Sequence, residues 1–153
     1  MKQWPEPVER VAAHVRAAAA DARIEEFSGG TRTVEAAAEA IGCDAAQIVK
    51  SLLFATTQGY VLALVPGDRR VDARKVGSGA RMAGPDEVRQ VTGFEPGGVA
   101  PFPVQPGVRV VVDPTLLGHE LVWTGAGTPR HMASMTPHDL VRLTNAGQAD
   151  LVE

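Results

Sequence analysis

The chain has 153 residues, 44% of them hydrophobic, and a formal net charge of −3, which suits one ordinary domain over residues 1–153 with its own core. The single cysteine, Cys43, excludes an internal disulfide, and the weak negative charge excludes a global basic field that would hold a long nucleic-acid duplex. Residues 1–5 lack the layout of a signal peptide and no apolar run reaches membrane-spanning length, so we expect a cytoplasmic protein with no membrane partner.

Helical spacing, capping residues and short apolar runs predict the order of the elements. The expected elements are a helix at 5–23, a helix at 34–41, a short helix after Asp44, strands at 52–55 and 60–65, a helical turn after Asp72, a strand at 81–83, a helix at 85–92, strands at 108–112, 121–123 and 132–135, and a last helix from Pro137 to near Gly147. Thr33 and Thr136 are expected to cap helices, and Gly42 and Gly93 to end them. The first two strands predict a hairpin covered on both faces. This pattern predicts an α/β (α+β) domain around a mixed sheet.

Lys50 is the first candidate functional residue because it lies within the apolar run 48–54 of a chain that has only three lysines. Burying an ammonium group costs free energy unless it is paired or meets a ligand anion. Two interpretations remain open for this residue. Its ammonium group binds an anionic ligand, or its aliphatic stem lies on apolar surface and its charge stays in water.

Two glycine-rich loops, at residues 97–103 and 125–129, are the second candidate feature. A backbone without side chains can approach a ligand closely and direct its amides at an anion or a developing oxyanion. A single glycine pair commonly forms only a turn, so the functional interpretation requires both loops to converge with Lys50. The sequence contains no metal-ligand spacing, phosphate-binding loop or nucleophile elbow. It therefore predicts neither a metal nor a cofactor.

A group of cations follows the hairpin, at Arg69, Arg70, Arg74 and Lys75. Arginine suits phosphate contact by its geometry. The alternative is a solvated face in which these cations alternate with Asp68 and Asp72.

Four motifs together resemble the YbaK/prolyl-tRNA synthetase-associated editing domain. They are TVEAAA at 33–38, QIVKSL at 47–52, GFEPGGVAPF at 93–102 and WTGAGTP at 123–129. The resemblance extends over residues 24–152. It implies a freestanding aminoacyl-tRNA deacylase that hydrolyses the ester bond of misacylated tRNA in trans. It also implies a mixed, barrel-like sheet flanked by helices.

The resemblance implies the residues of the site as well. Lys50 matches the lysine of the family and Ser51 its hydroxyl neighbour. The G-x-x-x-P loop corresponds to Gly97, Gly98, Val99, Ala100 and Pro101, and the remaining walls to Phe27, Thr124, Gly125, Ala126 and Gly127. Lys50 is expected to hold the terminal phosphates or ribose end of the tRNA, and amides around Gly98 to contact the oxyanion. An aminoacyl ester is already activated, so hydrolysis requires a positioned water and a stabilised oxyanion but no protein nucleophile.

Two positions depart from the family pattern. Many members carry glycine where this chain has Pro103, and some carry aspartate near the place of Met132 and Ala133. The amino acid removed therefore stays open, with a small one such as alanine, cysteine or serine expected. The expected partners are the acceptor end of a tRNA carrying a wrong amino acid and, as a second candidate, an aminoacyl-tRNA synthetase.

Two other functions remain open. The first is a non-catalytic module that binds the aminoacyl-tRNA end or a synthetase, because the sequence shows no obvious general base. The second is a hydrolase for another small aminoacyl or acyl ester, whose activity would not require the body of the tRNA.

Overall fold

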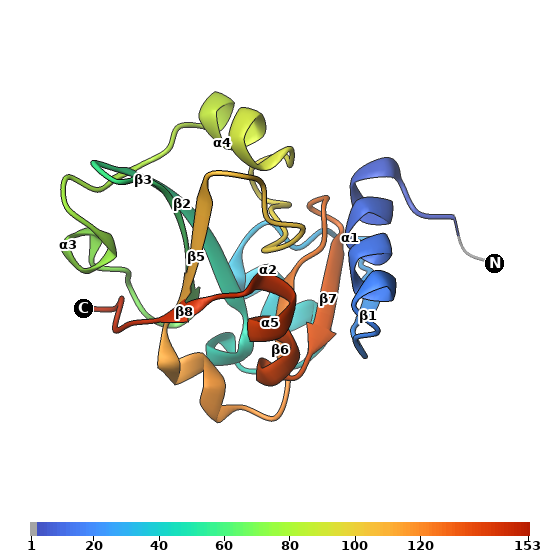
Figure 1. Cartoon of the computed structure of the whole chain (residues 1–153). Helices are drawn as coiled ribbons and strands as arrows, with labels where there is room; N and C mark the ends of the chain where they lie inside the picture. The colour runs from blue at the N-terminus through green and yellow to red at the C-terminus, as the bar shows by residue number, and fades with distance from the viewer. Residues whose placement is uncertain (1–2) are drawn as a thin grey trace.

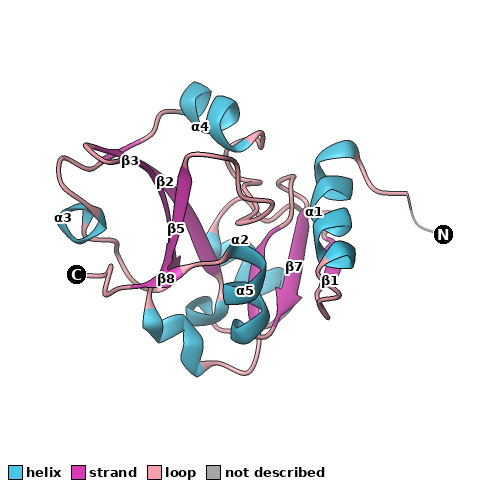
Figure 2. Ribbon diagram, viewed as in Figure 1, coloured by secondary structure: helices cyan, strands magenta, loops and turns pink. Residues whose placement is uncertain are grey.

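Two β-sheets surrounded by helices form the molecule (Figures 1 and 2). The computed structural model describes residues 3–153, so the prediction about a signal peptide falls partly on Met1 and Lys2, outside the described residues. The helices are α1 (Glu6–Ala17), α2 (Val34–Ile41), η1 (Ala45–Gln47), α3 (Ala73–Val76), α4 (Pro85–Thr92), η2 (Pro114–Gly118) and α5 (Pro137–Thr144). The strands are β1 (Arg23–Glu26), β2 (Val49–Thr56), β3 (Gly59–Pro66), β4 (Arg81–Met82), β5 (Val108–Val112), β6 (Val122–Gly125), β7 (His131–Met135) and β8 (Gly147–Gln148).

The larger sheet is mixed and has the strand order β4-β2-β3-β5-β8. Strand β2 pairs antiparallel with β3 and β4, whereas β5 pairs parallel with β3 and β8. The smaller sheet, β1-β7-β6, is antiparallel, and one parallel bridge between Ile48 and Trp123 links it to the start of β2. The predicted α/β domain with a mixed sheet is confirmed. The barrel-like closure is corrected to two open sheets, because the edge strands β4 and β8 pair over only two residues each.

Short-range sequence signals correctly predicted several local structures. Strands β2 and β3 pair in register down to Thr56 and Gly59, so the predicted hairpin is confirmed with a two-residue turn. The Thr33 side chain accepts a hydrogen bond from the Ala36 amide at 3.0 Å and caps α2. Helix α2 ends at Gly42, whose φ of +82° lies in the left-handed region that glycine adopts without strain.

Two helices end earlier than predicted, and in each case a residue with positive φ follows the helix and precedes a strand. Helix α1 ends at Ala17, Ala19 has a φ of +51°, and Arg23–Glu26 forms strand β1 against β7. Helix α5 ends at Thr144, its C-cap Asn145 has a φ of +52°, and Gly147 pairs in β8. Asparagine tolerates the left-handed conformation, so it replaces glycine as the end of the helix.

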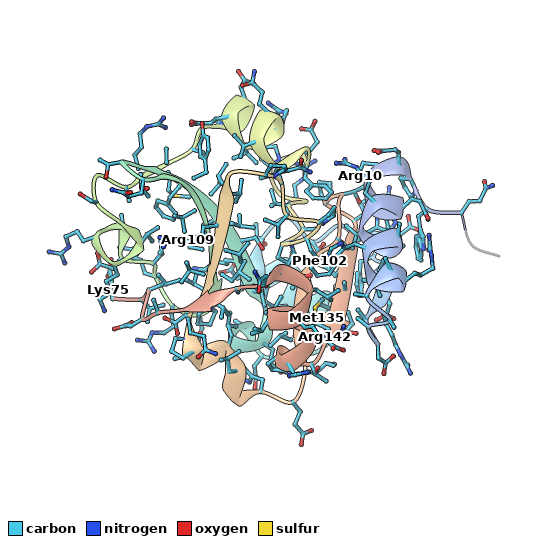
Figure 3. The ribbon with its side chains drawn as sticks, in the orientation of Figure 1. Arg10, Lys75, Phe102, Arg109, Met135 and Arg142 are labelled. Atoms are coloured by element: carbon cyan, nitrogen blue, oxygen red, sulfur yellow. The ribbon has the colours of Figure 1, made fainter. Side chains whose placement is uncertain are left out.

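The main hydrophobic core includes residues from α1, α5 and both sheets. Phe102 and Met135, which Figure 3 labels beside α5, are completely buried in it. A second core, which includes Phe54 and Val65, lies on the other side of the hairpin. The hairpin is therefore covered on both faces, as its continuous apolar runs predict. Burying each such large apolar side chain contributes about 1.5–3 kcal/mol.

The outer end of the hairpin is joined to α4 by Glu87. The Tyr60 hydroxyl donates a hydrogen bond to Glu87 Oε2 at 2.6 Å, and Arg81 Nη1 donates to Oε1 at 2.9 Å. The hydrogen bonds from Arg81 and then Tyr60 lower the pKa of Glu87 from 4.5 to about 2. A carboxylate with a depressed native pKa stabilises the fold above its ordinary pKa, and this contribution disappears as the pH falls from 4.5 toward 2.

We expect Glu87→Gln to unfold at a lower urea concentration than the wild type at pH 7. We also expect its midpoint to fall less between pH 4.5 and pH 2, the interval that the shifted pKa of Glu87 defines. Urea titrations across this interval test the prediction. Glu39→Gln is the control, because Glu39 is exposed and has no ion pair among the described residues. A pH dependence of Glu87→Gln equal to that of the wild type would contradict it.

Candidate functional site

The two glycine loops and the start of β2 enclose a cavity of about 260 Å³. Lys50 and Ser51 line it from β2, Gly97 and Val99 from the first loop, and Gly125 from the end of β6. The convergence required by the functional interpretation is therefore present. Five predicted site residues from three separate parts of the chain line one cavity.

Close backbone contacts fix the two glycine loops against each other. A Cβ atom on Gly125 would lie 2.5 Å from the carbonyl oxygen of Val99, and one on Gly98 would lie 2.7 Å from the Cα of Thr128. The Gly127 amide also donates a hydrogen bond to the Gly98 carbonyl at 2.9 Å. Glycine is needed at positions 98 and 125 because a side chain would push the loops apart and change the shape of the cavity.

Lys50 is half-buried, and its Nζ donates a hydrogen bond to the carbonyl oxygen of Arg69 at 2.5 Å. No described carboxylate lies within ion-pair distance of it. Burial lowers the pKa of Lys50 below its ordinary value, and the charges of Asp68 and Arg70 respectively oppose and reinforce that shift. An ammonium group has three hydrogens, so it can still donate to an anion in the cavity.

Backbone amides of the G-x-x-x-P loop supply further donors. The Gly98 amide already donates to the carbonyl of Glu95 at 2.9 Å, so it serves the turn itself. The amides of Gly97 and Val99, on either side of it, have no acceptor among the described residues, and both residues line the cavity. The candidate oxyanion donors are therefore the neighbours of Gly98.

Ser51 carries a buried hydroxyl for which residues 3–153 provide no hydrogen-bond partner. It lines the cavity and also an adjoining hollow of about 220 Å³ beside α4. A buried, unsatisfied hydroxyl costs free energy, and a polar group of a ligand would remove that cost. This makes Ser51 a candidate ligand contact.

The other predicted site residues do not line the cavity: Phe27, Gly98, Ala100, Pro101, Thr124, Ala126 and Gly127. Ala100 and Ala126 belong to the main core. Phe27 packs edge-on against Trp123 with ring centroids 6.2 Å apart. Pro101 lines a separate hollow beside α4.

The two departures from the family pattern have different positions. Pro103 follows a cis peptide bond and lines a separate hollow beside α4. Met132 is buried and lines the candidate cavity, together with Ala37 and Ile48. Of the two departures, the one at Met132 therefore lies at the candidate cavity.

Sequence reasoning missed several lining residues, including Thr31, Arg32 and Ala37. The only signal for them was the glycine-containing loop at 28–30 just before them.

The cations after the hairpin include two structural residues. Arg74 pairs with Asp72 at 3.2 Å, which confirms the solvated-face interpretation for this residue, whereas Lys75 pairs with Asp150 at 2.8 Å, a carboxylate outside the predicted group.

The fold is that of the YbaK-like class of α/β proteins, and in this chain a lysine and two glycine loops border one small cavity. The model of the aminoacyl-tRNA editing domain matches residues 28–143 of the chain. The chain belongs to this family of editing domains.

Similar proteins include freestanding chains and parts of synthetases. "Uncharacterized protein YwhH" of Bacillus subtilis is 36% identical over 122 residues, which are 76% of this chain and 78% of that protein. A proline–tRNA ligase of Pelotomaculum thermopropionicum is 34% identical over 133 residues, which are 78% of this chain but only 23% of the ligase. A solved structure described as a "putative trans-editing enzyme for prolyl tRNA synthetase" superposes with a TM-score of 0.90 and 38% identity, covering 99% of both chains.

Two further observations concern residues 3–153 as a whole. None of the helices formed by them combines the length and apolarity that crossing a bilayer requires. Their histidine, cysteine and acidic side chains form no group of three that could hold a metal ion.

Proposed function

We propose that this protein removes a wrong amino acid from misacylated tRNA in trans, by hydrolysing the aminoacyl ester bond. The observation that carries the proposal is the convergence of Lys50 with the unpaired amides of Gly97 and Val99 on one small cavity. The similarity to proline–tRNA ligases and to a structure described as a trans-editing enzyme supports tRNA for proline as the substrate. It also supports prolyl-tRNA synthetase as a partner, and translation in the cytoplasm as the setting.

The proposed reaction needs only groups that line the cavity and groups of the substrate. The Lys50 ammonium group holds the phosphate or ribose of the terminal nucleotide. The amides of Gly97 and Val99 donate hydrogen bonds to the carbonyl oxygen of the ester. Water, positioned with the free ribose hydroxyl, adds to the carbonyl carbon and gives a tetrahedral oxyanion. The bond to the ribose oxygen then breaks, the proton that the attacking water gives up passes to that oxygen, and a free amino acid and deacylated tRNA leave.

The lining of the cavity supports a small amino acid as the group removed. Ala37, Ile48 and Met132 provide apolar surface, and the cavity has a volume of only about 260 Å³. A cavity of this size excludes large side chains sterically, whereas one methylene group changes selectivity only about 10–200-fold. Alanine, cysteine and serine are therefore the candidates to test.

A deacylation panel tests the proposal directly. Proline-specific tRNA charged separately with alanine, cysteine, serine or proline is incubated with the protein, and release of the amino acid is followed. We expect faster release of at least one small, wrong amino acid than of proline. Tight binding of a non-hydrolysable aminoacyl adenosine analogue, without release from any tRNA, would instead support a non-catalytic binding module.

The pH dependence of ligand binding provides a separate prediction. Burial lowers the pKa of Lys50, so its positive charge is present below that pKa and disappears at a lower pH than the ordinary 10.5. We expect the affinity for adenosine monophosphate to fall by about tenfold, the effect of about 1.4 kcal/mol, over the interval from neutral pH to pH 10.5. Calorimetric titrations measure this fall. Lys50→Arg should retain its affinity across the interval because guanidinium stays charged, and a wild-type affinity independent of pH would contradict the prediction.

A further inference from the structure

We propose that a second hollow, next to the candidate cavity, binds a backbone phosphate of the single-stranded RNA that leads to the terminal nucleotide. The hollow has a volume of about 280 Å³ and is lined by residues 28–30, Arg32 and residues 128–130. Arg32 lines this hollow and also the candidate cavity, so the two lie next to each other. The proposal rests on the proposed function, since it takes the terminal nucleotide to occupy the candidate cavity.

Hydrogen bonds between two loops make the hollow a built feature of the fold. The amide and the hydroxyl of Thr31 both donate to the carbonyl oxygen of Pro129, at 2.6 and 3.0 Å. The amide of Phe27 donates to the carbonyl oxygen of Arg130 at 2.7 Å. Arg32 and Arg130 are thereby held on facing loops at the edge of one hollow. The Arg32 stem also lies close to the G-x-x-x-P loop, because a Cβ atom on Gly97 would lie 3.6 Å from its Cγ.

The charges around the hollow favour a phosphate ligand. Six other arginines form ion pairs with carboxylates: Arg10, Arg16, Arg74, Arg81, Arg89 and Arg142. Arg32 and Arg130 are exposed, and neither guanidinium has a partner among the described residues. No carboxylate of residues 3–153 lines the hollow. An arginine presents several N–H donors in a planar fork that matches phosphate, so two unpaired arginines here form an anion site.

Further donors line the same hollow. The amides of Ser28 and Gly29 and the Ser28 hydroxyl donate no hydrogen bond within the described part of the chain. These N–H and O–H groups can each donate a hydrogen bond to a different oxygen of one phosphate. The position of this hollow next to the candidate cavity favours RNA over an acidic peptide, because a nucleotide bound in the cavity would bring its neighbouring phosphate within reach of Arg32.

Binding of a short RNA hairpin with an unpaired CCA end tests the site without any hydrolysis. Each phosphate contact on single-stranded RNA contributes about 0.7 to the slope of log affinity against log salt concentration. Arg32→Gln and Arg130→Gln should therefore each bind the hairpin about fivefold more weakly at 0.1 M salt and lower the slope by about 0.7. Arg109→Gln is the matched control, since Arg109, which Figure 3 labels, is exposed, lacks an ion pair among residues 3–153 and lines a different hollow at the start of β5.

A hydrolysis assay separates this proposal from the proposed function. For Arg130→Gln, we expect the preference for misacylated tRNA over aminoacyl adenosine, which lacks a phosphate, to fall about fivefold at 0.1 M salt. Arg109→Gln should keep the preference of the wild type. The phosphate site would be overturned if the Arg130 and Arg109 variants had equal affinity for the hairpin, equal salt slope and equal preference for misacylated tRNA. It would also be overturned if the wild-type protein did not bind the hairpin. A different outcome would separate the two proposals: the wild type binds the hairpin in a salt-dependent way, Arg32→Gln and Arg130→Gln lose this binding, and the wild type hydrolyses no ester. That outcome would support the phosphate site and refute the deacylase.

Discussion

Replacing Lys50 with methionine is expected to lower kcat/KM for misacylated tRNA by about two orders of magnitude and to leave the fold intact. Methionine keeps the aliphatic stem that packs beside the cavity but removes the charge that would hold the terminal nucleotide. Because a misplaced ester no longer meets the amides of the G-x-x-x-P loop, both substrate affinity and turnover should fall. Single-turnover release of the amino acid measures the two effects separately.

Lys50→Met should lose activity without losing stability. A lysine whose pKa is lowered on folding is disfavoured in its charged form, so below that pKa its charge opposes folding. Its only described partner is the carbonyl oxygen of Arg69, in an exposed segment where water can replace the ammonium group. We therefore expect a thermal midpoint equal to or higher than that of the wild type.

Lys75→Met is the matched control for this substitution. Lys75 belongs to α3, on the side of the molecule opposite α1 in Figure 3, and pairs with Asp150 at 2.8 Å and the Val152 carbonyl at 2.6 Å. Its replacement should lower the thermal midpoint by a few degrees and leave deacylation at the wild-type rate. Wild-type kcat/KM in Lys50→Met would show that Lys50 is a surface lysine without a role in catalysis.

Gly125→Ala is expected to reduce deacylation about a hundredfold and to destabilise the protein by about 1–3 kcal/mol. The added Cβ would lie 2.5 Å from the carbonyl oxygen of Val99, closer than real Cβ contacts allow, and the obstacle is backbone that cannot rotate away. The G-x-x-x-P loop must therefore move, and it carries the amides of Gly97 and Val99 with it. Urea unfolding and the deacylation assay measure the two losses.

A second glycine separates this steric effect from the general effect of adding a methyl group. Gly147→Ala meets no atom within 4 Å in β8, and its φ lies outside the left-handed region. It should retain wild-type activity and gain a few tenths of a kcal/mol through lower entropy of the unfolded chain. Equal activities of Gly125→Ala and Gly147→Ala would show that the contact between the loops does not shape the site.

The sequence predicted those helices and turns whose ends depend on side chains and backbone angles within a few residues. Thr33 caps α2 because its side chain reaches an amide three residues later, and Gly42 ends that helix because its own φ is positive. Strand β1 was missed because Arg23–Glu26 has no alternating pattern and is a strand only through its pairing with β7. The barrel-like closure that the resemblance implied is absent from residues 3–153, which form two open sheets, since closure depends on which edge strands pair.

The candidate site was predicted only in part. Lys50 was identified from its charge in an apolar run, and the glycine loops from their composition, before any contact between them was known. Sequence reasoning could not separate Val99, which lines the cavity, from Ala100 beside it, which is buried in the core. Side-chain direction in an irregular loop follows no sequence period, so only the folded structure assigns it.

By itself, the sequence determined the α/β class, the positions of most helices, the hairpin, and the residue types able to bind an anion. These depend on spacing and conformation within a few residues, which neighbouring side chains and backbone angles decide. Only the tertiary structure decided that Lys50 has a backbone carbonyl partner but no carboxylate partner among residues 3–153, and that Gly125 touches the G-x-x-x-P loop. It also decided that Arg32 lines both the candidate cavity and the neighbouring hollow. These features require segments far apart in the chain to meet, and the packing of two sheets and their loops brings them together.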